Sequence, residues 1–212
     1  GDSHPCIAHT LGNLGAVHLL IGNTNVALDI LIESLYVKMS LRAKAKAEGT
    51  SESNISAADT FNNLGSASFI LGEYDDAMSY YRSALDEHGK FSGSSADVAD
   101  TLHNIGRIHF EKNELEDALV AMKESLQLTQ HSFGHEHVNV ADTLEKIGLI
   151  YLHQHRMDEA MSAFVEVLHL TKKILGPNHV DCAPSYHNIG MVREAKGEFK
   201  RAWESYTSAL DI

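Results

Sequence analysis

The chain contains only two cysteines, Cys6 and Cys182, which lie near its opposite ends. A disulfide requires Cα atoms within about 7 Å of each other, and one distant pair cannot form the disulfide framework that holds small secreted proteins together. The scarcity of cysteine indicates a reducing compartment, and we expect the protein to be cytoplasmic.

Long apolar stretches are also missing. The sequence has no segment of about 18 uncharged apolar residues, the length that a membrane-spanning helix needs. The first residues do not combine a basic region with an apolar run, as a signal peptide does. We therefore expect no membrane partner. The chain starts at Gly1 rather than at a methionine, and we expect it to be a fragment of a longer protein.

Basic residues are outnumbered by acidic ones. The 17 lysines and arginines face 29 aspartates and glutamates, which gives a formal net charge of −12. A nucleic-acid-binding protein instead carries a basic patch that neutralises phosphates. We expect no nucleic-acid partner.

Motifs for catalysis and for metal or cofactor binding are absent as well. There is no Gly-rich phosphate loop, no H-E-x-x-H and no nucleophile elbow. The H-x-H pairs, His135/His137 and His153/His155, supply two ligands each, whereas a zinc site needs three or four with supporting contacts. We expect no catalytic residue, no metal and no cofactor, and hence not an enzyme.

What the sequence does contain is a repeat. A glycine recurs at intervals of 50, 41, 42 and 42 residues, at Gly15, Gly65, Gly106, Gly148 and Gly190. An alanine stands twelve residues after each glycine, at Ala27, Ala77, Ala118, Ala160 and Ala202. Five copies in constant phase indicate one structural unit repeated five times. An insertion at residues 49–54 accounts for the longer first interval.

Each copy predicts a pair of helices. In residues 98–128, apolar residues recur with helical spacing on both sides of a polar break at Lys112-Asn113-Glu114. A glycine inside a helix costs about 1 kcal/mol relative to alanine, so its recurrence needs a compensating contact. We expect the glycine of the first helix to face the small alanine of the second, so that the two helices pack closely.

This spacing resembles the tetratricopeptide repeat (TPR), in which a large apolar residue and an aliphatic-Gly pair precede an alanine twelve positions later. The 42-residue period and the segments 1–8, 134–141 and 176–183 resemble the kinesin light chain type, whose connector reads G-x-x-H-P-x-V-A. The resemblance implies an all-α fold, a right-handed α-α superhelix (TPR solenoid) of five helix pairs in a single domain. We expect the repeats at about 4–48, 54–90, 95–133, 137–175 and 179–212.

The resemblance also implies that the first helices line a concave groove that binds a peptide. With the glycine as the eighth position, the sixth position reads Asn13, Asn63, Asn104, Lys146 and Asn188. Neighbouring inward positions add His103, His187 and Arg107. An asparagine amide both donates and accepts hydrogen bonds, so a row of them can hold an extended peptide backbone. The alternative is that these asparagines bond to neighbouring repeats and fix the stacking.

Acids outnumber bases at the inward positions. The acids are Asp59, Asp100, Glu111, Asp142 and Glu145, and the bases are Arg107 and Lys146. By electrostatic complementarity we expect a protein or peptide partner with some positive charge. Alternatively, the aspartates at the second position only favour the helix N-termini through the helix dipole.

The sequence thus predicts a non-catalytic protein-interaction scaffold that binds a partner peptide in the groove, resembling the cargo-binding repeats of kinesin light chains. Two alternatives stay open. The chain stops at Ile212 without the polar capping helix that solenoids need, which would suit an assembly module that forms a homodimer through its terminal repeats. It could also be the regulatory segment of a larger signalling protein.

Overall fold

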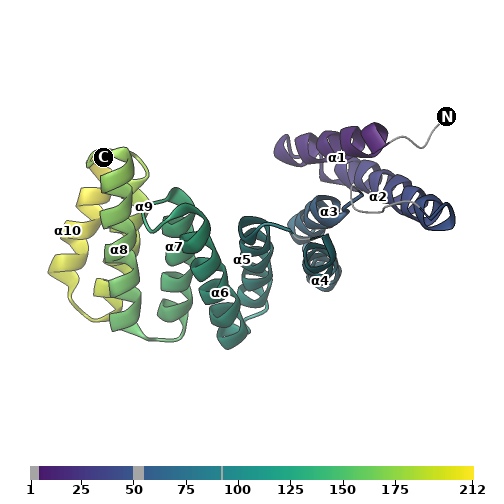
Figure 1. Cartoon of the computed structure of the whole chain (residues 1–212). Helices are drawn as coiled ribbons and strands as arrows, with labels where there is room; N and C mark the ends of the chain where they lie inside the picture. Colours follow the sequence, from purple (N-terminus) through teal and green to yellow (C-terminus); the bar gives the residue numbers. More distant parts are fainter. Residues whose placement is uncertain (1–4, 50–54, 92) are drawn as a thin grey trace. The chain divides into compact units, whose positions relative to one another are not determined.

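The computed structural model describes residues 5–49, 55–91 and 93–212. Within these ranges the chain forms ten α-helices and no strand (Figure 1). The helices are α1 (Pro5–Leu20), α2 (Thr24–Ala47), α3 (Ala58–Ile70), α4 (Tyr74–Phe91), α5 (Ser95–Glu111), α6 (Leu115–Phe133), α7 (Val138–His153), α8 (Met157–Leu175), α9 (Cys182–Ala195) and α10 (Phe199–Leu210). The predicted all-α fold of helix pairs is confirmed.

Helix positions follow the sequence pattern closely. The fourth repeat, for example, was expected at about 137–175, and its helices α7 and α8 lie at Val138–His153 and Met157–Leu175. Residues 1–4 of the first connector motif and residues 50–54 of the insertion lie outside the described part of the chain.

The chain divides into two compact units, Gly1–Ile108 and His109–Ile212, and the boundary falls within α5. In the first unit α1 packs on α2, α3 packs on α4, and α2 also contacts α3. In the second unit α7 packs on α8 and α9 on α10, while α6 contacts α7 and α8 contacts α9. The prediction of a single domain stays a prediction.

At four of the recurring glycines, the atoms nearest to an added Cβ belong to a large side chain and not to the alanine that the sequence led us to expect. A Cβ atom on Gly65 would lie 2.7 Å from the ring of Tyr81, and one on Gly148 would lie 2.6 Å from the ring of Phe164. Tyr81 and Phe164 are almost fully buried. These two glycines therefore make room for the large side chain sixteen residues later. The same contact recurs between Gly15 and Leu31 and between Gly190 and Tyr206.

Two connector histidines, His137 and His179, bond to the backbone close to the start of a helix. His137 precedes α7, and its Nδ1 accepts a hydrogen bond of 3.2 Å from the backbone N–H of Asn139. His179 accepts the same bond, also 3.2 Å, from the N–H of Asp181. The bond to His137, the N-cap of α7, satisfies one of the N–H groups that a helix start leaves unpaired. The bond to His179 lies in the turn before α9, whose N-cap is Asp181. The connector histidines thus have a structural role.

The turn between the two helices of a repeat needs a left-handed backbone. Gly22, Gly72 and Gly197 have φ between 76° and 81°, whereas Asn113 and His155 occupy the same place with φ of 59° and 58°. A β-carbon disfavours this region, although asparagine tolerates it better than most residues. His155 therefore carries more backbone strain than the other four residues.

We expect His155→Gly to raise the free energy of unfolding by about 0.5–1 kcal/mol, because glycine adopts positive φ without a steric penalty. Urea unfolding followed by circular dichroism measures the change. The control is Gln154→Gly, since Gln154 has φ of −78° and the flexible glycine should there destabilise by a similar amount. A free energy of unfolding that falls in His155→Gly as it does in Gln154→Gly would contradict the assignment of strain to His155.

Candidate functional site

A pocket of about 240 Å³ opens on the second unit between α7, α8 and α9. Its lining combines an apolar floor with a polar rim. The residues are Val138, Ala141, Asp142, Glu145, Val167, Thr171, Ile174, Leu175, Asp181, Pro184 and Ser185. Among them are two of the inward positions of the first helix of the fourth repeat, Asp142 and Glu145, and one of the fifth, Pro184. The inner face of this unit is thus hollowed where the inward acids lie.

Glu145 is the centre of the polar contacts at this pocket. Its Oε1 accepts a hydrogen bond of 3.0 Å from Nδ2 of Asn188 on the neighbouring first helix. Its Oε2 lies 3.4 Å from Nζ of Lys146. Lys146 also lies 3.9 Å from Asp142. The structure therefore brings two predicted site residues, Lys146 and Asn188, into contact with Glu145. From the sequence, Glu145 was counted among the acids of the groove but was not predicted to bind the peptide.

The pocket keeps an excess of negative charge. Asp142, Glu145 and Asp181 contribute three carboxylates, and Lys146 is the lysine paired with two of them. Asp181 lies 3.5 Å from the ring of His179, which is charged only when protonated. With a neutral histidine, these groups sum to about two negative charges beside an apolar floor. Such a site attracts a cation that has an apolar stem.

The predicted site residues of the first unit form a different environment. On α5, Arg107 donates to Oδ1 of Asn104 at 3.4 Å. The Arg107 guanidinium also lies 4.4 Å from the ring centre of Phe69 on α3, which is a cation–π contact. His103 is half-buried on the same helix, Asn63 is half-buried on α3, and Asn13 is exposed on α1. Asn104 and Arg107 are the predicted residues that contact each other here.

His187 lies exposed on α9, with its ring centre 5.4 Å from that of Tyr206 on α10. The Tyr206 hydroxyl donates a hydrogen bond of 2.7 Å to Glu194. Burial and this contact with a carboxylate raise the pKa of Tyr206 to about 12. The phenol therefore stays neutral and keeps its donor role throughout the physiological pH range. His187 does not line the pocket.

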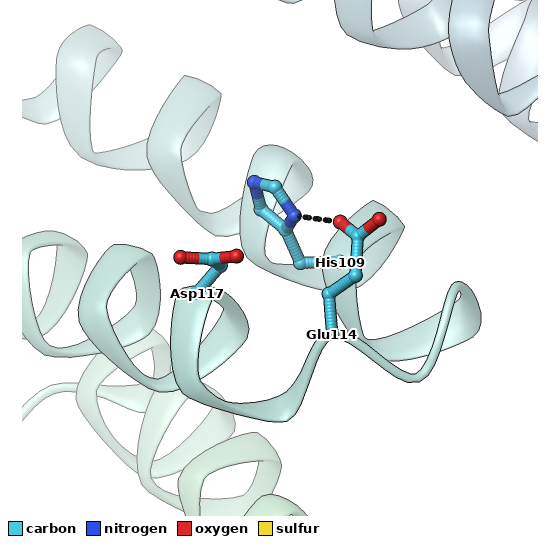
Figure 2. Close-up of side chains that lie close together, drawn as sticks. All are labelled: His109, Glu114 and Asp117. Atoms are coloured by element: carbon cyan, nitrogen blue, oxygen red, sulfur yellow. Dashed lines mark hydrogen bonds and ion pairs between the residues drawn. The ribbon is translucent and has the colours of Figure 1, made fainter.

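Figure 2 shows a second polar cluster, where His109, Glu114 and Asp117 point toward one another. Nδ1 of His109 lies 2.5 Å from Oε2 of Glu114, and one candidate ligand atom of each residue lies within 4.8 Å of the others. Glu114 and Asp117 stand at the start of α6, where the helix dipole favours acidic side chains. Their position is therefore explained by the helix start, and the His109–Glu114 bond closes the turn before it.

Apolar side chains are exposed on the first and last helix pairs. Leu14 on α1 is 44% exposed, whereas Leu64 and Ile147 at the same repeat position are buried under a preceding second helix. On α10, Phe199 and Trp203 are each about two-thirds exposed. Both surfaces have the character of repeat-to-repeat contacts.

In the part of the chain that the structure describes, the helices are all too short or too polar to cross a membrane. A family model described as tetratricopeptide repeat matches residues 56–131, 97–170 and 139–212. No curated protein matches the chain.

Solved structures share the fold at low sequence identity. BtubC (BKLC) from P. vanneervenii superposes with a TM-score of 0.82 and 20% identity, covering 98% of this chain and 80% of that one. A putative kinesin light chain from Podosopora anserina, with nearly identical TPR-like repeats, gives 0.77 and 15% over 98% and 95%. MamA from Desulfovibrio magneticus RS-1 gives 0.66 and 16% over 100% and 95%. The resemblance to kinesin light chain repeats is thereby confirmed at the level of the fold.

Proposed function

Because this chain belongs to the tetratricopeptide repeat family, and repeats of this family serve as protein-interaction scaffolds, we propose that the inner face of its second unit binds a partner peptide. We propose further that the pocket between α7, α8 and α9 takes a lysine or arginine side chain of that peptide. The observation that carries the proposal is the group of three carboxylates, Asp142, Glu145 and Asp181, around an apolar floor.

The pocket suits a basic side chain in both shape and charge. Val167 and Ile174 offer apolar surface to the methylene groups of lysine or arginine. Glu145 and Asp142 offer acceptors to the charged end. Nζ of Lys146 already lies 3.4 Å from Glu145, so a peptide cation would compete with an internal lysine. The second unit therefore favours partners that bring their own positive charge.

Asn188 fits the stacking interpretation better than peptide binding. It is 7% exposed, and its amide is engaged by Glu145 of the preceding repeat. The asparagines of the first unit, Asn13, Asn63 and Asn104, are more accessible, and we propose that they contact peptide backbone.

An immobilised peptide library with each position scanned in turn tests the proposal. We expect the 212-residue chain to select lysine or arginine at one position of the bound peptides. Glu145→Gln keeps the side-chain shape and a hydrogen-bond acceptor but removes the charge, so this preference should fall by about tenfold or more. Lys146→Met removes the internal competitor and should strengthen the preference.

The matched control is Glu166→Gln, which removes one exposed carboxylate from α8 outside the residues that line this pocket. It should leave the selected peptides unchanged. Selection of acidic peptides, or an equal loss of binding in Glu145→Gln and Glu166→Gln, would contradict the assignment of the pocket.

Assembly through the terminal helix pairs is a second candidate function. The exposed Leu14, Phe199 and Trp203 favour it. Leu64 and Ile147, at the position of Leu14 in other repeats, are buried, and so are Met78 and Leu119 at the position of Trp203. Under this candidate the two end faces of different molecules would pack on each other, head to tail.

A further inference from the structure

The outer face of α2 carries two apolar side chains where the other second helices carry mostly polar ones. Ile32 is 50% exposed and Tyr36 is 73% exposed. The residues at the position of Tyr36 in the later repeats are polar and exposed: Asp86, Gln127, His169 and Asp211. Those at the position of Ile32 are Arg82, Lys123, Val165 and Thr207. Apolar groups at positions that are otherwise solvated indicate a surface with a partner.

A preceding repeat would not cover this surface. Asp86 and His169 are exposed although another second helix packs before the pair that contains each of them. A preceding second helix covers the first helix instead, at the position of Leu64 and Ile147. The apolar stripe on α2 therefore needs a different occupant.

We propose that this occupant is α2 of a second copy of the chain, packed antiparallel about a two-fold axis at Tyr36. Ile32 stands four residues before Tyr36 and Met39 three residues after it, and both are exposed on the same side of the helix. An antiparallel copy places Ile32 of each helix against Met39 of the other, with the two tyrosines between them. The surface is thus self-complementary, as a two-fold interface requires.

The charged residues on this face also favour the antiparallel arrangement. Asp29 stands seven residues before Tyr36 and Lys44 eight residues after it, and both are exposed. Two antiparallel helices bring Asp29 of each copy to Lys44 of the other. A parallel pair would instead place Asp29 beside Asp29. Lys44 is 69% exposed and its ion pair with Glu48 is long, at 3.9 Å, so little holds it within its own helix.

Light scattering coupled to size exclusion, over a range of concentrations, tests the proposal on the 212-residue chain. We expect the mass to rise from 23.3 kDa and to level off at twice that value. Tyr36→Lys should leave a monomer at every concentration. Trp203→Lys, a matched change of an exposed aromatic residue on α10, should leave the dimer intact. Circular dichroism confirms that both variants are folded.

Charge reversal identifies the orientation. Asp29→Lys and Lys44→Asp should each weaken the dimer by about tenfold or more, and the double variant should restore it, because the pair is re-formed with opposite sign. A mass above that of a dimer, together with a monomeric Trp203→Lys variant, would show head-to-tail assembly and overturn the proposal. A monomer throughout, a dimer that survives Tyr36→Lys, or a double variant without recovery would overturn it as well. Peptide selection by the second unit is a separate readout and does not depend on α2.

Discussion

Arg42→Ala is expected to lower the free energy of unfolding of the first unit by about 3–5 kcal/mol, because it leaves a buried carboxylate without its partner. Arg42 on α2 binds both carboxylate oxygens of Glu87 on α4, and its Nε donates to the carbonyl of Ile55 at 2.7 Å. Glu87 also accepts from the N–H of Ala57 at 3.1 Å, and its side chain is 5% exposed. One arginine thus joins α2, α4 and the segment before α3.

Hydrogen exchange read by mass spectrometry measures this effect. Peptides from α2 and α4 should lose protection in Arg42→Ala and keep it in Lys46→Ala, which removes an exposed charge from the same helix. Equal protection in Arg42→Ala and the unsubstituted chain would contradict the structural importance of the Arg42–Glu87 pair.

The same pair makes the first unit sensitive to acid. Burial alone would raise the pKa of Glu87, but the bonds from Arg42 and from the Ala57 N–H outweigh it and hold the pKa below its ordinary value of 4.5. The unfolded chain therefore binds this proton more readily than the folded chain. The stabilisation is complete well above pH 4.5 and is lost as the pH falls through the lower, folded-state pKa.

Gly148→Ala is the second substitution with a large expected effect. The added Cβ would meet the ring of Phe164 at 2.6 Å, and Phe164 is 0% exposed, so the ring has no room to move. Overpacking of this kind costs about 1–3 kcal/mol, beyond what the better helix propensity of alanine returns. Urea unfolding followed by circular dichroism measures the loss.

Gly12→Ala is the matched control, since it also replaces a glycine within a first helix. Its Cβ would meet no atom closer than Ser34 Oγ at 3.5 Å, and the substitution should stabilise by about 0.5–1 kcal/mol. Similar effects of the two alanines would show that the recurring glycine does not serve the contact with Phe164.

The fold was predictable because the repeat phase and the helical spacing agree in every copy. Gly148 and Ala160 marked the two helices of the fourth repeat, and these residues lie in α7 and α8, which run from Val138 to Leu175. The partner of the glycine was not predicted correctly. Phe164 stands sixteen residues after Gly148, and the residue there varies in type between repeats, as Leu31 and Tyr81 show. The alanine was chosen as the partner of the glycine because it is the same residue in all five repeats.

The candidate site was predictable only in part. The inward positions of Asp142, Glu145 and Lys146 followed from the helical repeat, and the structure brings these side chains together. The pocket floor was not anticipated, because Val167 and Ile174 come from the second helix and only the first helices were expected to line the groove. Asp181 lies in a connector, where helical periodicity assigns no face. Contacts between repeats, such as that of Asn188 with Glu145, could not be predicted because they depend on how successive repeats stack.

Methyl-labelled nuclear magnetic resonance with a lysine-containing peptide tests the central claim most directly, because two valines on α8 report on opposite faces. Val167 lines the pocket, while Val165 is 49% exposed and does not. If the pocket binds the basic side chain, the methyl signals of Val167 and Ile174 shift on titration, those of Val165 stay in place, and Glu145→Gln removes the shifts. Shifts at Val165 with unmoved signals from Val167 and Ile174 would contradict binding at the pocket.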